Sequence, residues 1–302
     1  MIAPGAAQGI RTERARAAET GVTTHFNVLR RVRQLAYDAA GVVVAVVMLF
    51  PIYWMVATAF KPGQDILRLE PKWFPNPITL QNFGDAISRP FFLEDVKNSL
   101  VIVGTMLAAA LAISFLAAVG TARFGFKGRT AYLVMIIAVQ MVPLNALIIP
   151  LYLMLDRVTL TDALPGVILV YLAVVLPFMV WTLRGFVANI PAELEESAMI
   201  DGCTRFGAFI RITFPLIGPG LVATAIFGFI QAWNEYIVAY VLLSSPENQT
   251  LTVWLASFTT NHGPEWGPLM AAATLTGLPV VAFFLILQRY LAGGLTAGAV
   301  KG

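Results

Sequence analysis

The sequence predicts an all-α membrane protein with six transmembrane helices. Three observations support this fold class: 58% of the 302 residues are hydrophobic, only 12% are charged, and the mean hydropathy is +0.76. Soluble domains contain roughly 45–50% apolar and about 25% charged residues. A soluble fold could not cover so much apolar surface, so a soluble enzyme, a disordered chain and a nucleic-acid-binding protein are all disfavoured.

Six long stretches without Asp, Glu, Lys or Arg mark the expected membrane spans. A transmembrane helix needs about 20 mostly apolar residues. Each stretch is unbroken rather than alternating, which indicates a helix and not a barrel strand. We expect the fifth span to continue past Glu235 to about Leu243. The six stretches are Ala39–Phe60, Asn98–Ala122, Thr130–Leu155, Ala163–Leu183, Ile212–Asn234 and Trp266–Gln288.

The Lys and Arg residues predict the side of the membrane on which each connection lies. Cytoplasmic connections carry an excess of these residues. With the N-terminus inside, most of the 20 Lys and Arg residues fall on the cytoplasmic side, and the last outer loop, Ser244–Glu265, has none. We therefore expect an N-in and C-in orientation.

The same pattern predicts the organisation of the chain. The first stretch is too long and starts too late for a signal peptide, whose apolar region has about 7–15 residues. We therefore interpret it as an uncleaved span, although Ala57-Thr58-Ala59 looks like a cleavage site. The expected segments are a cytoplasmic tail (1–38), the first transmembrane helix (39–60), an extracytoplasmic loop (61–97), a core with the other five transmembrane helices (98–291) and a cytoplasmic C-terminal tail (292–302).

The connection between the fourth and fifth spans, residues 190–214, predicts two short helices joined at a glycine, which we call the elbow. Pro191 followed by three glutamates indicates a helix start, because proline suits the first turn and the helix dipole stabilises carboxylates there. Gly202 interrupts this helix. It provides either an unusual backbone angle or close approach, or an ordinary helix end.

The second helix of the elbow is expected from about Thr204 to Phe214, with Pro215 ending it and opening the fifth span. Its apolar residues recur at helical spacing, which places them on one face. Such a face either lies on lipid or inserts into the groove of a soluble partner. The residues on this face are Phe206, Phe209, Ile210, Thr213 and Phe214.

A motif in the elbow carries a family resemblance. Glu196-Ser197-Ala198, three residues, Gly202, nine residues and then Ile212-Thr213-Phe214-Pro215 match the pattern E-A-A, x3, G, x9, I-x-L-P, with Ser197 and Phe214 as mild departures. The chain thus resembles the permease subunits of bacterial ABC importers. Trp233-Asn234-Glu235-Tyr236 and residues 294–302 are similar to the carbohydrate, maltose-permease-like group, and there to the shorter of the two permease partners.

The resemblance implies the type I ABC importer permease fold in the bacterial cytoplasmic membrane. It also implies a second permease subunit, a cytosolic ATPase dimer that docks on the elbow, an extracytoplasmic sugar-binding protein and a sugar substrate. Membrane lipid would surround the spans, and no nucleic acid would bind. The residues implied in coupling to the ATPase are Glu196, Ser197, Ala198, Asp201, Gly202, Phe206, Phe209, Ile212 and Pro215.

No cofactor is expected in this chain. The sequence contains no G-x-x-x-x-G-K-[ST] motif, whose backbone amides cradle the phosphates of ATP. ATP and Mg²⁺ are therefore expected on the partner ATPase, and this chain is not expected to be an enzyme.

Polar residues within the spans are candidates for the substrate path, because polar groups in the membrane are costly and usually act in function or hold helices together. A sugar path needs amides or carboxylates for hydroxyl groups and aromatic rings for the sugar faces. Interhelical hydrogen bonding, or an interfacial position of Glu235, is the alternative. The candidates are Gln140 and Asn145, on either side of Pro143, which is expected to kink the third span, and Trp233, Asn234, Glu235 and Tyr236.

Two other functional classes stay open at this point. A self-sufficient secondary transporter or channel needs an ionisable residue deep in a span, for which Glu235 is the candidate, and internal repeats are not evident. An intramembrane enzyme needs catalytic side chains gathered at one membrane face. His25 and His262 are expected on opposite sides, so we expect no catalytic residues and no metal site.

Overall fold

The computed structural model describes residues 33–298, with side chains described up to residue 290. The chain divides into two compact units, with the boundary between Ala57 and Thr58. The first helix, Arg33–Ala59, confirms the first predicted span and begins before Ala39. Every residue from 33 to 53 is exposed, as expected of a helix that lies in lipid. The predicted tail 1–38 lies mostly outside the described residues.

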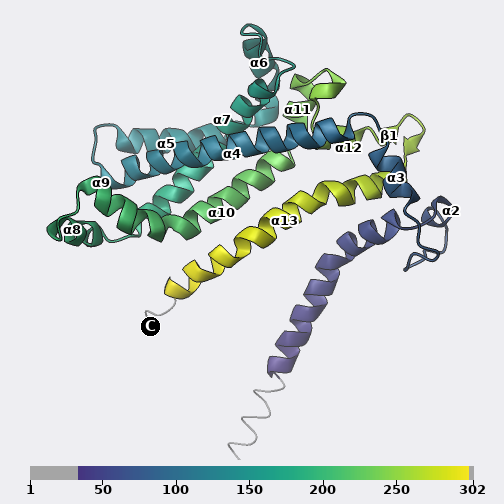
Figure 1. Cartoon of the computed structure of the whole chain (residues 1–302), viewed down its shortest axis with the longest axis horizontal. Coiled ribbons are helices and arrows are strands. Elements are labelled where there is room, and N and C mark those ends of the chain that lie inside the picture. The colour runs from purple at the N-terminus through teal and green to yellow at the C-terminus, as the bar shows by residue number, and fades with distance from the viewer. Residues whose placement is uncertain (1–32, 299–302) are drawn as a thin grey trace, which may run out of the picture. The chain divides into compact units, whose positions relative to one another are not determined.

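The second unit is built almost entirely of helices (Figure 1). Its long helices, which match predicted spans two, four, five and six, are α4 (Phe92–Arg123), α7 (Leu164–Ala188), α10 (Phe214–Trp233) and α13 (Trp266–Gly298). The described residues contain five helices, including the first, that are long and apolar enough to cross a membrane. A sixth span arises if the bent pair α5 (Arg129–Gln140) and α6 (Leu144–Asp156) is counted as one.

Short elements connect the long helices. They are α2 (Gly63–Ile66), α3 (Gln81–Ile87), α8 (Glu193–Ile200), α9 (Arg205–Ala208), the π-helical turn η1 (Phe209–Thr213), α11 (Ile237–Leu242), the 3-10 turn η2 (Pro246–Asn248), α12 (Leu251–Ala256), and the antiparallel strands β1 (Thr259–Thr260) and β2 (Gly263–Pro264).

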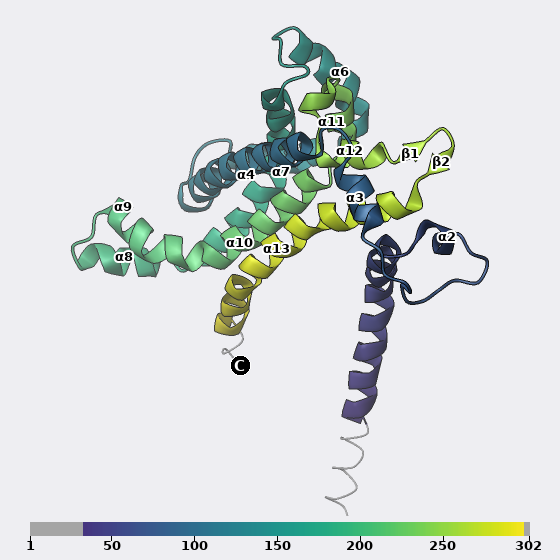
Figure 2. The ribbon, with the colours of Figure 1, turned by 45° about the vertical axis from the view of Figure 1, so that its right-hand side comes forward.

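The core lies where α4 packs along α7 and α10 packs against both (Figures 1 and 2). Close approach depends on small residues, as is usual between membrane helices. A Cβ atom added at Gly228 of α10 would lie 3.1 Å from Leu107 of α4 and 3.3 Å from the sulfur of Met179 of α7. Other buried residues of this core are Ile102, Met106, Ala110, Val167, Tyr171, Val175 and Phe229.

The third span is not the single helix that the apolar stretch Thr130–Leu155 predicts. The chain breaks between α5 and α6, and the two helices meet at an angle of 99°. Pro143 precedes α6 with extended backbone angles, and proline lacks the N–H group that a continuous helix would use. Proline also disfavours the helical conformation of the residue before it. The predicted kink at Pro143 is thus confirmed, and its size exceeds that of a simple bend.

The start of the fifth span also differs from the prediction. Residues Arg205–Trp233 form one helical run, so Pro215 neither ends the elbow helix nor begins a separate span. The π-helical turn Phe209–Thr213 ends two residues before the proline. In a π turn each amide bonds to the carbonyl five residues back instead of four. This local change accommodates the proline, which has no N–H group to donate and whose ring would clash with the carbonyl four residues before it.

The far end of the fifth span is shorter than predicted. Helix α10 ends at Trp233, and the separate helix α11 follows, so no continuous helix extends to Leu243. Glu235 accounts for the break, because its carboxylate accepts hydrogen bonds from the backbone amides of Val238 at 2.9 Å and Ala239 at 3.2 Å. A carboxylate that receives these otherwise unpaired amides caps the start of a new helix.

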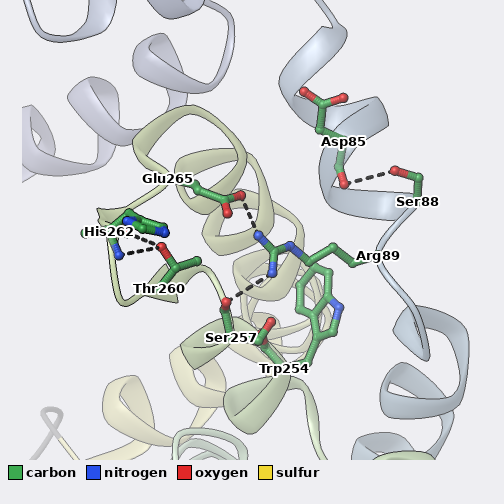
Figure 3. A network of polar contacts seen from close by, with 9 residues as sticks. Asp85, Ser88, Arg89, Trp254, Ser257, Thr260, His262 and Glu265 are labelled. Carbon is green, nitrogen blue, oxygen red and sulfur yellow. Dashed lines mark hydrogen bonds and ion pairs between the residues drawn. The ribbon is translucent and has the colours of Figure 1, made fainter.

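At the end of the second unit where α4 begins, Arg89 ties three segments together (Figure 3). Its guanidinium donates to the carbonyl of Ser257 at 3.0 Å, forms an ion pair with Glu265 and lies 4.0 Å from the ring centre of Phe258. Arg89 follows α3, Ser257 follows α12, and Glu265 precedes α13. The contacts therefore hold the base of the β1–β2 hairpin against α3.

The start of α4 makes further polar contacts with the segment before α12. The Asn98 amide donates to the carbonyls of Glu247 at 2.8 Å and Gln249 at 3.0 Å. The hydroxyl of Ser99 accepts a bond from the amide of Leu251 at 2.8 Å. These bonds supply the partners that a buried loop backbone requires.

Asp162 anchors the loop that follows α11 to the loop before α7. Its carboxylate accepts hydrogen bonds from the amides of Ser244 at 3.0 Å and Ser245 at 2.9 Å, and from the Ser245 hydroxyl. Burial alone would raise the pKa of Asp162, but the bonds from the two serines outweigh it, and the pKa lies below its usual range. The carboxylate is therefore charged at neutral pH and holds both loops.

We predict that Gly220→Ala destabilises the packing of α10 on α7, whereas Gly218→Ala does not. A Cβ atom at Gly220 would lie 2.5 Å from Cγ of Phe186, while one at Gly218 meets nothing within 4 Å. Overpacking of this kind costs about 1–3 kcal/mol. Thermal unfolding of the detergent-purified variants provides the measurement, and equal transition temperatures would contradict the packing argument.

Candidate functional site

The elbow contains two helices that meet at a left-handed glycine. Helix α8 starts with three glutamates in its first turn, and Gly202 has φ +91°, an angle that residues with a side chain rarely adopt. Thr204 then caps α9, because its hydroxyl accepts a bond from the amide of Gly207 at 3.1 Å. Gly202 thus provides the unusual backbone angle, which was one of the two sequence interpretations.

An ion pair joins the elbow to the end of α4. The Arg123 Nε atom donates to Oε1 of Glu195 at 2.9 Å, and another Arg123 nitrogen donates to the carbonyl of Ile190 at 3.0 Å. The hydroxyl of Thr213 donates to the same glutamate oxygen. The side chains of Arg123 and Glu195 are only 15% and 16% exposed, so water screens the pair weakly. One carboxylate therefore connects α4, α8 and the turn that leads into α10.

Aromatic contacts support the same junction. Phe115 of α4 lies 5.5 Å from the ring centres of both Phe209 and Phe214, and the Arg205 guanidinium lies 5.8 Å from that of Phe124. Between α4 and the elbow is an apolar cavity of about 620 Å³. Its lining includes Leu116, Val119, Phe124, Met199, Phe206 and Phe209, with Arg123, Glu195 and Glu196 beside them.

The predicted coupling residues separate into an outer and an inner group. Phe206 is 72% exposed, and Ile200, which the sequence did not single out, is 86% exposed. Phe209 is half-buried and faces α4 through its contact with Phe115. The exposed members of the set are Glu196, Ser197, Asp201, Gly202, Phe206 and Pro215, and the half-buried members are Ala198, Phe209 and Ile212.

Sequence reasoning did not nominate Arg123, Glu195 and Thr213 as a connected group. Glu195 was one of several acidic residues at a helix start, and Arg123 lay at the end of another span. The two residues are separated by 72 positions in the chain. The only available signal was that an arginine at the end of a span and a glutamate in the elbow carry opposite charges. Many other pairs of residues do so as well, and this signal therefore does not identify the pair that forms.

The candidate substrate residues of α10 and its break make intramolecular contacts. Trp233 is buried, and its indole N–H donates to the carbonyl of Thr276 at 3.1 Å. The carboxylate of Glu235 accepts a hydrogen bond from the Tyr171 hydroxyl at 2.8 Å, in addition to those from the two backbone amides of α11. Asn234 is exposed and bonds to the carbonyl of Ile230, and half-buried Tyr236 stacks on Tyr240 with ring centres 5.4 Å apart.

The other two candidate substrate residues, Gln140 and Asn145, do not lie at the same cavity. Gln140 lines a cavity of about 380 Å³ at the break between α5 and α6, and Asn145 is exposed but is not among its lining residues. A second amide, Gln231 of α10, lines the same cavity. Sequence reasoning missed Gln231, although an intramembrane glutamine in the fifth apolar stretch was a visible signal.

No group of three or more His, Cys, Asp or Glu side chains in residues 33–290 lies close enough to hold a metal ion. Cys203, in the turn of the elbow, accepts a weak contact from Arg211 at 3.6 Å.

The sequence profile of the family described as "Binding-protein-dependent transport system inner membrane component" matches residues 110–296, which include the elbow and the spans around it. The chain belongs to this family. It is therefore a transporter permease rather than an enzyme, and the family description places its relatives in the inner membrane.

Curated relatives support the same family. The permease is 44% identical over 265 residues to the diacetylchitobiose uptake system permease protein DasC of Streptomyces coelicolor, covering 88% of this chain and 96% of that protein. It is 32% identical over 269 residues to the trehalose/maltose transport system permease protein MalG of Thermococcus litoralis, covering 86% and 94%.

A solved structure confirms the fold of an ABC importer permease. The similar structure is that of a bacterial ABC transporter involved in the import of the acidic polysaccharide alginate, with a TM-score of 0.73 and 20% identity. The match covers 86% of this chain and 96% of that chain. The predicted type I permease fold is thereby confirmed.

We predict that Glu195→Gln loosens the elbow and that Glu193→Gln does not. The first change removes the charge that pairs with Arg123, whereas Glu193 is an exposed residue of the same helix. A hydrogen bond between charged groups contributes about 1.5–3 kcal/mol, so amide exchange in α8 should quicken at least about tenfold. Hydrogen–deuterium exchange of the two variants measures this, and equal protection of α8 would show that the ion pair does not hold the elbow.

Proposed function

We propose that this permease forms half of the translocation path of a binding-protein-dependent sugar importer and receives the motion of a separate ATPase through the elbow. The observation that carries the proposal is the elbow itself, which exposes Phe206 and Ile200 beside Glu196 and Asp201 while Arg123 and Glu195 tie it to α4. An exposed apolar residue flanked by charges fits the groove of a soluble partner.

The partners follow from this role. A cytosolic ATPase dimer, which binds ATP and Mg²⁺, docks on the elbow, and closure of the dimer favours one arrangement of the permease helices. A second permease subunit supplies the other half of the path, and an extracytoplasmic binding protein delivers the sugar. The chain then lies in the cytoplasmic membrane with both termini inside.

Relatives support a sugar as the cargo. Their names refer to diacetylchitobiose, to trehalose and maltose, and to arabinooligosaccharides. Because the permease covers nearly the whole length of each of these proteins, we assign it the same substrate class: disaccharides and short oligosaccharides. Diacetylchitobiose is the first probe, since the relative with 44% identity is named for it.

The contacts of Glu235 argue against the alternative of a self-sufficient secondary transporter. A coupling carboxylate has to exchange a proton or an ion with the path. Both oxygens of Glu235 are instead engaged, by the Tyr171 hydroxyl and by the amides that start α11. This arrangement holds the helix break.

Purification and reconstitution test the proposed function. The tagged chain is purified from its native membranes in mild detergents, and we expect a second permease and an ATPase to purify with it. Proteoliposomes containing this complex should take up diacetylchitobiose or maltose only with ATP and the binding protein. Uptake of either sugar by the purified chain alone, without ATP, would refute the proposal.

We predict that Gly202→Val abolishes uptake, whereas Gly202→Asn retains most of it. The φ of +91° at this position is strained for a β-branched residue, while asparagine tolerates positive φ comparatively well. Nothing lies within 4 Å of a Cβ atom there, so the backbone angle rather than a clash distinguishes the two variants. Sugar uptake and ATPase activity of the reconstituted complexes provide the measurement, and equal uptake by both variants would remove the turn from the coupling mechanism.

A further inference from the structure

The cavity at the break between α5 and α6 has the properties of a small-molecule site. Its volume is about 380 Å³, and binding sites for small molecules span about 300–1,000 Å³. Residues of α5, α6, α7 and α10 line it, and Pro143 at the break is one of them. All four helices belong to membrane spans or to the bent pair. The cavity therefore lies among the transmembrane helices.

Two amide side chains face this apolar cavity without a protein partner. Gln140 is the last residue of α5, Gln231 lies near the end of α10, and both are exposed. Neither side-chain amide forms a hydrogen bond within residues 33–290. Two polar side chains that follow Gln231 in the sequence are paired: Trp233 bonds to Thr276, and Asn234 bonds to Ile230. A polar group at membrane depth is costly unless a ligand or another chain satisfies it.

An aromatic pair lies in the same lining. The rings of Phe178 in α7 and Phe227 in α10 stack with centres 3.8 Å apart and an interplanar angle of 30°. A sugar presents hydroxyl groups at its rim and apolar C–H groups on its ring faces. Amides that donate and accept, next to aromatic rings, match both parts of such a ligand.

We propose that Gln140, Gln231 and the Phe178–Phe227 pair form a sugar-binding subsite on this permease. The inference rests on the proposed function and adds to it a place for the substrate. The two amides bind hydroxyl groups, and the aromatic pair covers a ring face. The subsite thus assigns direct substrate contact to this subunit.

Leucine variants of the two amides test the subsite in the complete reconstituted importer, with saturating binding protein loaded with diacetylchitobiose. Gln140→Leu and Gln231→Leu should each lower sugar transported per ATP hydrolysed about tenfold, because each loses a hydrogen bond to the sugar. Gln288→Leu is the matched control, since Gln288 is an exposed glutamine of α13 that does not line the cavity. It should transport like the unmodified importer.

A labelling experiment tests occupancy directly. Cys203 is the single cysteine of the chain, so Cys203→Ser allows one new cysteine to be labelled selectively. In this background Ala173→Cys, at an exposed lining residue to which the proposal gives no hydrogen bond, should react with a maleimide. Diacetylchitobiose delivered by the binding protein should slow the reaction at least about threefold, in proportion to the occupied fraction. Gln288→Cys should react at the same rate with and without the sugar.

The outcomes separate this subsite from the proposed function. If the unmodified importer moves neither diacetylchitobiose nor maltose, the proposed function fails and the subsite with it. If sugar is transported but the leucine variants match Gln288→Leu and no protection occurs, only the subsite is refuted. If the variants lose the second permease during purification, the cavity is a subunit interface, which also overturns the subsite.

Discussion

The ion pair between Arg123 and Glu195 is the interaction on which the geometry of the elbow depends. Glu195 also receives Thr213, so one carboxylate joins α4, α8 and the start of the fifth span. Helix α4 contains no proline, whereas α6, α7, α10 and α13 each have a proline beyond the first turn of the helix. At its other end α4 holds the segment before α12 through Asn98 and Ser99. A stiff helix thus has polar anchors at both ends.

Within the spans the dominant constraint is that lipid offers no hydrogen bonds. Thr121, Thr224 and Thr276 satisfy it by donating to carbonyls of their own helices. Trp233 finds its hydrogen-bond partner on another helix, and Glu235 finds its partners in the backbone amides at the start of α11. Gln140 and Gln231 form no such side-chain bond within residues 33–290, and they line the same cavity.

Much of the fold could be predicted because segments that cross a membrane are long apolar stretches without charged residues. Apolar stretches located the first helix, α4, α7, α10 and α13, and Pro143 marked the kink between α5 and α6. The 99° angle could not be predicted, since proline determines where a helix breaks and packing determines its direction. The continuous run through Pro215 was missed because a π turn has no sequence signal as clear as that of a proline.

The sequence by itself determined the membrane class, the position of the elbow and the glycine at its turn, because these depend on local composition, spacing and backbone freedom. Only the tertiary structure decided which residues lie together: Arg123 with Glu195, Gln140 with Gln231, and Glu235 with Tyr171. Each pair joins residues from different elements. Such contacts depend on how helices pack, and packing is a property of many side chains at once that no local pattern encodes.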